Sequence, residues 1–194
     1  MRQTTLRLIV GLVFGASFLI TSCDSVDSNS SNQNARIRLL LTDAPAKEIA
    51  SANVTISRIE IVGTDGAVQT LSESAQEFDL LTLQNGTTAV LVDTPLNLGT
   101  YSYLRLFVEK DALVIYTDGK EAELTIPSGF ESGIKILLND VTLDNETDVE
   151  MLTLTLDFNV QESFVDAGES GLLLFKPVIK VKQADVNGEE LLVE

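Results

Sequence analysis

Carboxylates are the most abundant reactive side chains in this sequence. Its 194 residues include 29 aspartates and glutamates, a single cysteine and no histidine. Without histidine the chain lacks the usual general base and the commonest zinc ligand, so histidine-activated nucleophiles are excluded. Two carboxylates about 5–10 Å apart can hydrolyse glycosides, but in so acidic a chain such pairs arise by chance. We therefore expect no enzymatic activity, with a carboxylate-dependent glycoside hydrolase as the less favoured alternative.

One acidic stretch has the composition of a calcium site. The segment "NDVTLDNETD" lies between two alternating apolar segments, and carboxylate and carbonyl oxygens are the ligands that calcium takes. It lacks the regularly spaced acids and the glycine of an EF-hand loop. We expect a solvated acidic loop and no cofactor. The alternative is a weak calcium site formed by Asp140, Asp144, Glu146 and Asp148.

The single cysteine, Cys23, follows an apolar segment. Residues 8–20 are apolar behind Arg2 and Arg7, which is too short to span a bilayer but typical of a secretory signal. The segment ends in "ITSC", which resembles the lipobox of bacterial lipoproteins. In that class the thiol receives a diacylglyceryl group, a palmitate-type anchor, and a dedicated peptidase cuts before the cysteine. The residues that would direct this cleavage are Ile20, Thr21 and Ser22.

The predicted organisation follows from this anchor. Residues 1–22 are expected to be the signal peptide, and 23–35 the acylated cysteine with a disordered polar tether. Residues 36–183 form the predicted domain and 184–194 a C-terminal tail. Several acyl chains together hold a protein stably on a membrane. We expect a lipid-anchored protein of the bacterial cell envelope, with the inner-membrane, outer-membrane and cell-surface sides all open.

Charge restricts the partners. The formal net charge is −16 at pH 7, and cleavage before Cys23 would make it −18. Such acidity disfavours nucleic acid, whose binding depends mainly on phosphate contacts. A glycan or an envelope protein is the expected partner besides the membrane. The final predicted strand carries lysines on one face, which indicates an edge guarded against aggregation or a docking surface for an acidic partner or glycan. These lysines are Lys176, Lys180 and Lys182.

The folded part is predicted to be all-β. Short segments alternate between apolar and polar residues at 8–15-residue spacing with no long helical period, which favours a sandwich or barrel. Residues 149–159 are the clearest strand, with alternate leucines facing inward. Asp118–Gly119 and Asp65–Gly66 indicate hairpins, the latter of type I′. We predict a single antiparallel β-sandwich, immunoglobulin-like or transthyretin-like, of eight or nine strands.

Three local features interrupt the strand pattern. Val54 and Ile56 differ in parity from Ile59 and Ile61, so a β-bulge at Ser57–Arg58 is needed to place all four on one side. In the segment "TDAP", Asp43 is expected to cap backbone groups, with a ligand role as the alternative. Pro177 cannot donate a ladder hydrogen bond, which predicts an edge or a bulge.

Six ordered segments resemble a known domain. They are "LTDAPAKEIASANVTISRIEIVGTDG", "FDLLTLQNG", "LNLGTYSYLRLFVE", "SGIKI", "LTLDFNV" and "LLLFKPVIK". Together they are similar to the bacterial and archaeal envelope domain known as domain of unknown function 4382, over about residues 36–182. The resemblance implies a secreted or lipid-anchored β-domain with no assigned activity. It supplies no catalytic residues.

Two functional classes remain besides an enzyme. The leading hypothesis is a lipid-anchored, non-catalytic module with a binding or structural role. The alternative is an adhesin or pilus-type subunit that assembles by strand exchange. Its detachable strand would be "RIRLLLT", residues 36–42 behind the tether.

Overall fold

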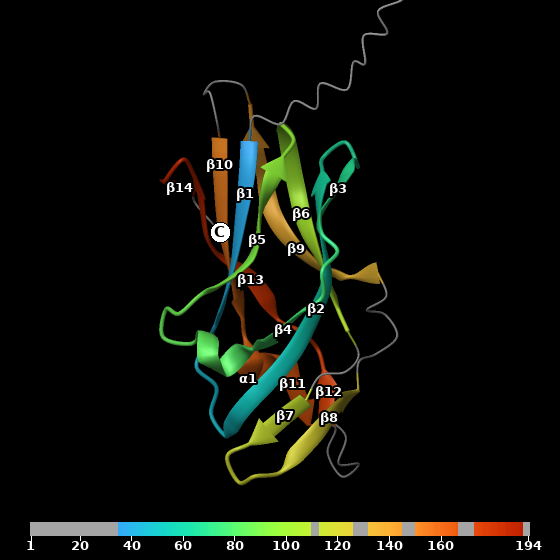
Figure 1. The fold of residues 1–194 in the computed structure, drawn as a ribbon, viewed down its shortest axis with the longest axis vertical. Coiled ribbons are helices and arrows are strands. Elements are labelled where there is room, and N and C mark those ends of the chain that lie inside the picture. The colour runs from blue at the N-terminus through green and yellow to red at the C-terminus, as the bar shows by residue number, and fades with distance from the viewer. Residues whose placement is uncertain (1–34, 110–112, 126–131, 145–149, 167–172, 192–194) are drawn as a thin grey trace, which may run out of the picture. The chain divides into compact units, whose positions relative to one another are not determined.

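Two β-sheets form the domain, as the computed structural model shows (Figure 1). The structure describes residues 35–109, 113–125, 132–144, 150–166 and 173–191. The predicted all-β sandwich is confirmed. The described residues form 14 strands, more than the eight or nine expected. One predicted strand, residues 171–184, is divided between the sheets, and residues assigned to the tail form another strand.

The first sheet has five strands in the order β14-β13-β10-β1-β5. Their bounds are β1 (Ala35–Asp43), β5 (Ala89–Leu96), β10 (Glu150–Phe158), β13 (Ile179–Val186) and β14 (Glu189–Leu191). β1 lies between β5 and β10 and runs parallel to β10. The antiparallel prediction is therefore incomplete, since β1 and β10 are separated by the strands of the other sheet and a parallel pair requires such a long crossover.

The second sheet has nine strands, of which seven follow the order β11-β12-β8-β7-β2-β6-β9 and two, β3 and β4, pair with β2. Their bounds are β2 (Ile49–Gly63), β3 (Val68–Ser72), β4 (Gln76–Asp79), β6 (Gly99–Val108), β7 (Leu113–Tyr116), β8 (Glu121–Thr125), β9 (Ile134–Leu143), β11 (Phe164–Asp166) and β12 (Leu173–Phe175). β8 and β12 form the second parallel pair among the described residues. Every other pairing described is antiparallel.

Two single helical turns lie within the described ranges. They are η1 (Leu80–Leu83) and α1 (Val160–Ser163). The side chain of Asp79 accepts the Leu81 N–H in η1, and that of Asn159 accepts the Glu162 N–H in α1. No helix within the described residues has the length and the apolar character that crossing a membrane requires.

The core lies between the two sheets. Alternate residues of β10 are completely buried, as the sequence predicted, and the inward residues of β1 and β6 share the same cluster. The largest of these side chains are Ile37, Leu39, Leu41, Leu104, Leu106, Leu152, Leu154, Leu156 and Phe158. The outward positions on β10 are only partly buried. The period-two pattern therefore marks one face of each strand as core.

The predicted bulge in β2 is confirmed. The β2–β6 register shifts between Ile56 and Arg58, so Ser57 is an extra residue. The shift returns Ile59 and Ile61 to the side of Ile56, and all three are at most 2% exposed. Because β2 pairs with β3, β4, β6 and β7, this one residue sets the phase of the nine-stranded sheet.

The Asp65–Gly66 turn lies where the sequence predicts it, but it differs from the predicted type. Asp65–Gly66 joins β2 to β3, but Gly66 alone has a positive φ there, so the turn is not type I′. Asn187 and Gly188 both have positive φ and connect β13 to β14. Residues 184–191, assigned above to a C-terminal tail, therefore continue the five-stranded sheet.

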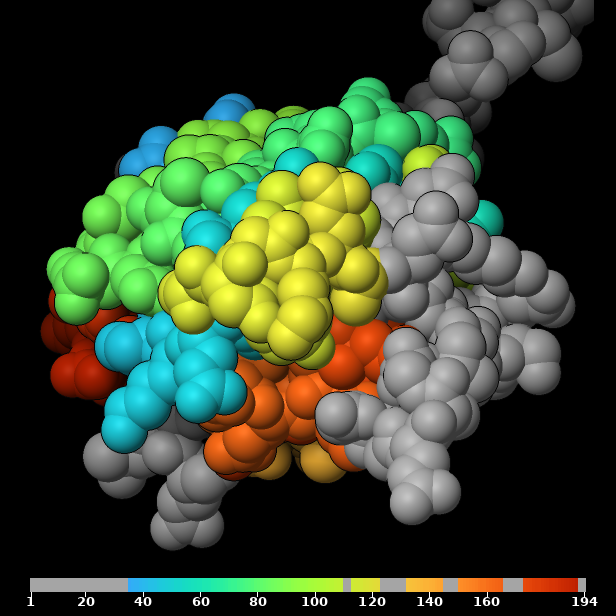
Figure 2. Space-filling model, turned by 90° about the horizontal axis from the view of Figure 1, so that it is seen from below, coloured from blue at the N-terminus to red at the C-terminus, as the bar shows by residue number. Residues whose placement is uncertain are grey.

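Pro177 marks a change of sheet. The segment predicted as one final strand is divided into β12, in the nine-stranded sheet, and β13, in the five-stranded sheet. The proline lies between them, where no ladder hydrogen bond is required. Figure 2 shows the end of the domain where β7 and β8 project, with the start of β2 and the segment containing α1 beside them.

Asp43 ties the end of β1 to two later segments. Its Oδ1 accepts the N–H of Val160 in α1 at 3.2 Å, and its Oδ2 accepts Nε2 of Gln84 at 3.2 Å. The neighbouring Thr42 donates its hydroxyl to the carbonyl of Leu83 at 2.8 Å. Asp43 is only 2% exposed. The predicted capping role is confirmed, and both carboxylate oxygens serve the fold.

Burial raises the pKa of Asp43 to about 6, and the nearby Asp157 charge adds to the rise. An acid whose pKa is higher in the folded state stabilises the fold below its unfolded pKa, and that stabilisation is lost as pH rises through 6. We expect the free energy of unfolding of wild type, relative to Asp43→Asn, to fall by roughly 1–3 kcal/mol between pH 4 and 7. Urea unfolding of both proteins at several pH values measures this. Parallel pH profiles would contradict it.

Candidate anion-binding surface

Part of the predicted site set lies outside the described residues. The lipidation position Cys23 and the cleavage residues Ile20, Thr21 and Ser22 are all in residues 1–34. Glu146 and Asp148, two of the four calcium candidates, are in residues 145–149. The predictions for these residues remain predictions.

The other two calcium candidates are described and exposed. Asp140 is in β9 with a left-handed backbone, φ 58°, and its Oδ1 accepts the Ser102 hydroxyl at 2.9 Å. Asp144 directly follows β9. Across the parts of the chain that the structure describes, no three histidine, cysteine, aspartate or glutamate side chains gather as a metal site.

The three lysines predicted to share a face are separated. Lys176 lies before Pro177, between β12 and β13, because the proline divides the strand. Lys180 is opposite Asp157 in the β10–β13 register, and Lys182 is the extra residue at a bulge. Lys182 Nζ lies 3.8 Å from Asp157 Oδ1. Lys180 and Lys182 line a cavity of about 480 Å³ between β9 and β13, here called the lysine groove.

A second basic cluster surrounds Glu60 on the outer face of the nine-stranded sheet. Glu60 is 8% exposed. Its two carboxylate oxygens each lie 3.2 Å from a guanidinium nitrogen, one of Arg58 and one of Arg105. The two arginine side chains are 42% and 30% exposed. One nearly buried carboxylate thus forms ion pairs with two arginines whose side chains remain partly exposed to solvent.

Aromatic rings hold the same cations in place. The Arg58 guanidinium lies 3.8 Å from the ring centroid of Phe107, and Lys135 Nζ lies 4.0 Å from that of Tyr103. Arg105 also donates to the Tyr103 hydroxyl at 3.3 Å. Cations over ring faces gain about 0.5–1 kcal/mol at exposed sites and lose side-chain freedom. The cluster is therefore preorganised, with a local excess of positive charge.

The cluster surrounds a shallow cavity of about 370 Å³, here called the arginine hollow. It is lined by Arg58, Tyr103, Arg105, Phe107, Ser132, Gly133 and Lys135. Gly133 has φ +77°, and a Cβ there would lie 2.5 Å from Cγ of Arg105. Only glycine fits at position 133 without displacing the Arg105 side chain.

Lys135 lines the arginine hollow and the lysine groove alike. Together they make one basic surface, defined by Arg58, Arg105, Lys135, Lys180 and Lys182, which are five of the chain's 13 basic residues. The ion-pair partners described for these five cations are two carboxylates, Glu60 and Asp157, so positive charge is in excess here. The arrangement suits the binding of anionic groups.

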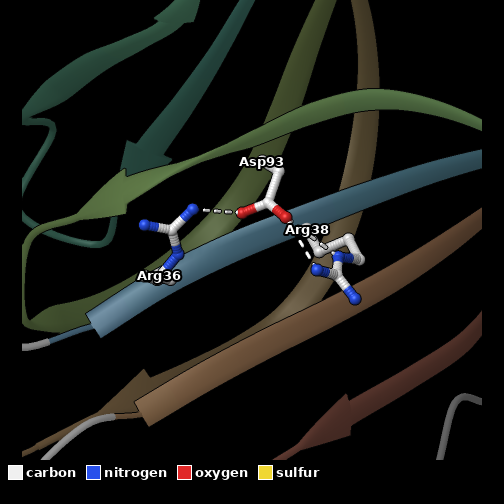
Figure 3. Close-up of polar contacts among 3 residues, drawn as sticks. All are labelled: Arg36, Arg38 and Asp93. Carbon is white, nitrogen blue, oxygen red and sulfur yellow. Dashed lines mark hydrogen bonds and ion pairs between the residues drawn. The ribbon is translucent and has the colours of Figure 1, made fainter.

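A second pair of arginines is neutralised differently. Arg36 and Arg38 on β1 both bind Asp93 on β5, at 2.5 and 2.8 Å (Figure 3). Their hydrogen bonds hold the pKa of Asp93 below its ordinary value. The carboxylate lies between the two guanidinium groups and engages both. No cavity that we describe is lined by them, in contrast to Arg58 and Arg105.

Sequence analysis missed the arginine hollow, although part of its signal was present. In β6, Tyr103, Arg105 and Phe107 alternate with the buried Leu104 and Leu106, so they share the outer face. Lys135 joins them from β9 because it pairs with Arg105 in the β6–β9 register. This pairing joins segments that are distant in the sequence, so spacing along the chain does not reveal it.

A comparison with protein families assigns the domain to a family. Residues 34–177 match the family described as a domain of unknown function (DUF4382). The match extends from the residue before β1 to the proline that precedes β13. No curated protein matches the sequence. Since the match covers more than half of the chain, the protein belongs to the DUF4382 family.

Proposed function

We propose that the protein is a lipid-anchored, non-catalytic module of the cell envelope that binds an anionic partner through its basic surface. The anchor is supported by the signal-like segment and by "ITSC" at residues 20–23. The binding role is supported by the arginine hollow and the lysine groove. Neither the anchor nor the partner requires a catalytic group.

The observation that carries the binding role is the Glu60 cluster. Arg58 and Arg105 are held by one nearly buried carboxylate and two aromatic rings, while their guanidinium groups stay partly exposed. Charged groups fixed before binding lose little conformational entropy when a ligand arrives. In a chain of net charge −16, this surface is where an anion would be attracted.

The strand-exchange alternative is less well supported. β1, its proposed mobile strand, lies between β5 and β10, and Ile37, Leu39 and Leu41 are completely buried. Its detachment would expose three large apolar side chains, at about 1.5–3 kcal/mol each, and would break two ladders. The lipid-anchored binding module therefore remains the leading proposal.

Retention on sulfated beads tests the binding role. A protein of net charge −16 is repelled by such beads unless a local basic surface binds them. We expect the full-length chain, held in neutral detergent, to be retained at low salt and released at about 0.2 M salt, where exposed charges are screened. Arg105→Gln/Lys135→Gln should flow through.

The matched control is Lys47→Gln/Lys120→Gln, which removes two exposed positive charges elsewhere. Both double variants have the same net charge, so the control should be retained as wild type is. Equal behaviour of the two variants, or flow-through of wild type, would contradict a localised basic surface.

A separate experiment tests the anchor. Cys23→Ala removes the chain's only thiol, so we expect an uncleaved precursor that takes up no palmitate analogue. Metabolic labelling and gel mobility of the expressed chain measure both effects. Normal processing and labelling of this variant would rule out lipidation at Cys23.

A further inference from the structure

We propose that the ligand of the basic surface is a linear acidic polysaccharide, bound through its carboxylate or sulfate groups across β2, β6, β9 and β13. This inference rests on the proposed function and specifies its ligand. The experiments below separate the two, because a basic surface could bind other polyanions.

The length of the surface indicates a polymer. Glu60, Arg105 and Lys135 are register partners on three adjacent strands, and neighbouring strands lie about 4.8 Å apart. Beyond Lys135 the basic residues continue across the lysine groove to Lys180 and Lys182 on β13. The positive charges therefore extend further than a single small anion can contact. A chain with repeated anionic groups fits them.

The aromatic rings identify which part of the ligand is recognised. Neutral sugars bind by stacking on aromatic ring faces, but here Arg58 lies over one face of Phe107 and Lys135 over one face of Tyr103. The rings position cations, so the groups that bind here are anionic. Arginine presents a planar fork of donors that suits carboxylate, sulfate and phosphate oxygens in a bidentate manner.

The edge strand argues against an acidic peptide. An extended peptide gains affinity by adding to a regular free edge. Tyr101 pairs with Val141 and Tyr103 with Leu137, so residues 138–140 all lie opposite one residue of β6. Asn139 and Asp140 both have left-handed φ, 53° and 58°. Such a bulge disrupts the ladder that a peptide strand would need.

The overall charge argues against a densely charged polymer. Duplex DNA carries one charge per about 1.7 Å, and most of its length would lie over the acidic remainder of this protein. An acidic polysaccharide has its charges on separate sugar units. Its anionic groups can contact the basic surface while its neutral ring atoms lie over the acidic remainder of the protein surface.

Calorimetric titration of the full-length chain in neutral detergent tests the ligand class. The probes are polygalacturonate, chondroitin sulfate, polyglutamate, neutral dextran and a galacturonate disaccharide. We expect one or both acidic polysaccharides to bind roughly tenfold or more tightly than polyglutamate, with a salt-dependent affinity. Dextran should not bind. The first two probes distinguish carboxylate from sulfate recognition.

Each other outcome overturns the inference. Polyglutamate binding equally or more tightly would assign an acidic peptide instead, and would leave the basic surface of the proposed function intact. Dextran binding would show recognition of neutral sugar rings. No binding of either acidic polysaccharide, despite retention on sulfated beads, would refute the polysaccharide but not the anionic partner.

Lys180→Gln/Lys182→Gln tests whether the hollow and the groove bind one chain. This variant should lower the affinity for polygalacturonate by roughly tenfold while leaving that for the disaccharide unchanged, because the arginine hollow is intact. Loss of both affinities to the same degree, or of neither, would contradict a continuous polymer site.

Gly133→Ala tests whether position matters beyond charge. The added Cβ must displace Arg105, so we expect affinity for the acidic polysaccharide to fall several-fold with no change in net charge. Gly66→Ala is the matched control, because Gly66 has a similar φ of +84° but nothing lies within 4 Å of its added Cβ. Equal affinity of the two variants would contradict a positioned guanidinium site.

Discussion

A single extra residue in β2, Ser57, sets the two faces of the nine-stranded sheet. Val54 and Ile56 face the core, so without the register shift Arg58 and Glu60 would follow them inward. Two charges in an apolar core would each cost several kcal/mol. The bulge instead keeps the isoleucines buried and places the charges on the outer face beside β6. Core packing and the basic surface thus depend on the same irregularity.

The interactions within the basic surface orient its cationic side chains more than they stabilise the fold. Glu60 is almost completely buried, and its ion pairs with two guanidinium groups offset the free-energy cost of removing its carboxylate from water. Phe107 and Tyr103 then support the cations from their ring faces. Removing Glu60 would leave two neighbouring arginines to repel each other. The carboxylate therefore sets where the positive charges point, and the acidity of the remaining surface confines anions to this face.

Local sequence patterns predicted those features of the structure that depend on residues close together in the chain. The alternation in β10, the bulge at Ser57 and the capping by Asp43 all follow from short-range parity and turn chemistry. The parallel placement of β1 beside β10 and the meeting of Lys135 with Arg105 depend on strand pairings between distant segments, which spacing alone does not encode. The Asn187–Gly188 dipeptide is itself a local hairpin signal, although residues 184–194 are predicted above as a tail.

Hydrogen–deuterium exchange of the full-length chain, with and without saturating polygalacturonate, tests the central claim most directly. If the ligand lies across the basic surface, protection should rise in residues 56–62 of β2, 101–108 of β6 and 134–139 of β9. Exchange around Arg36 and Arg38, whose charges Asp93 already neutralises, should stay unchanged. Protection confined to that second arginine pair, or absent from all three strands despite binding, would contradict the account.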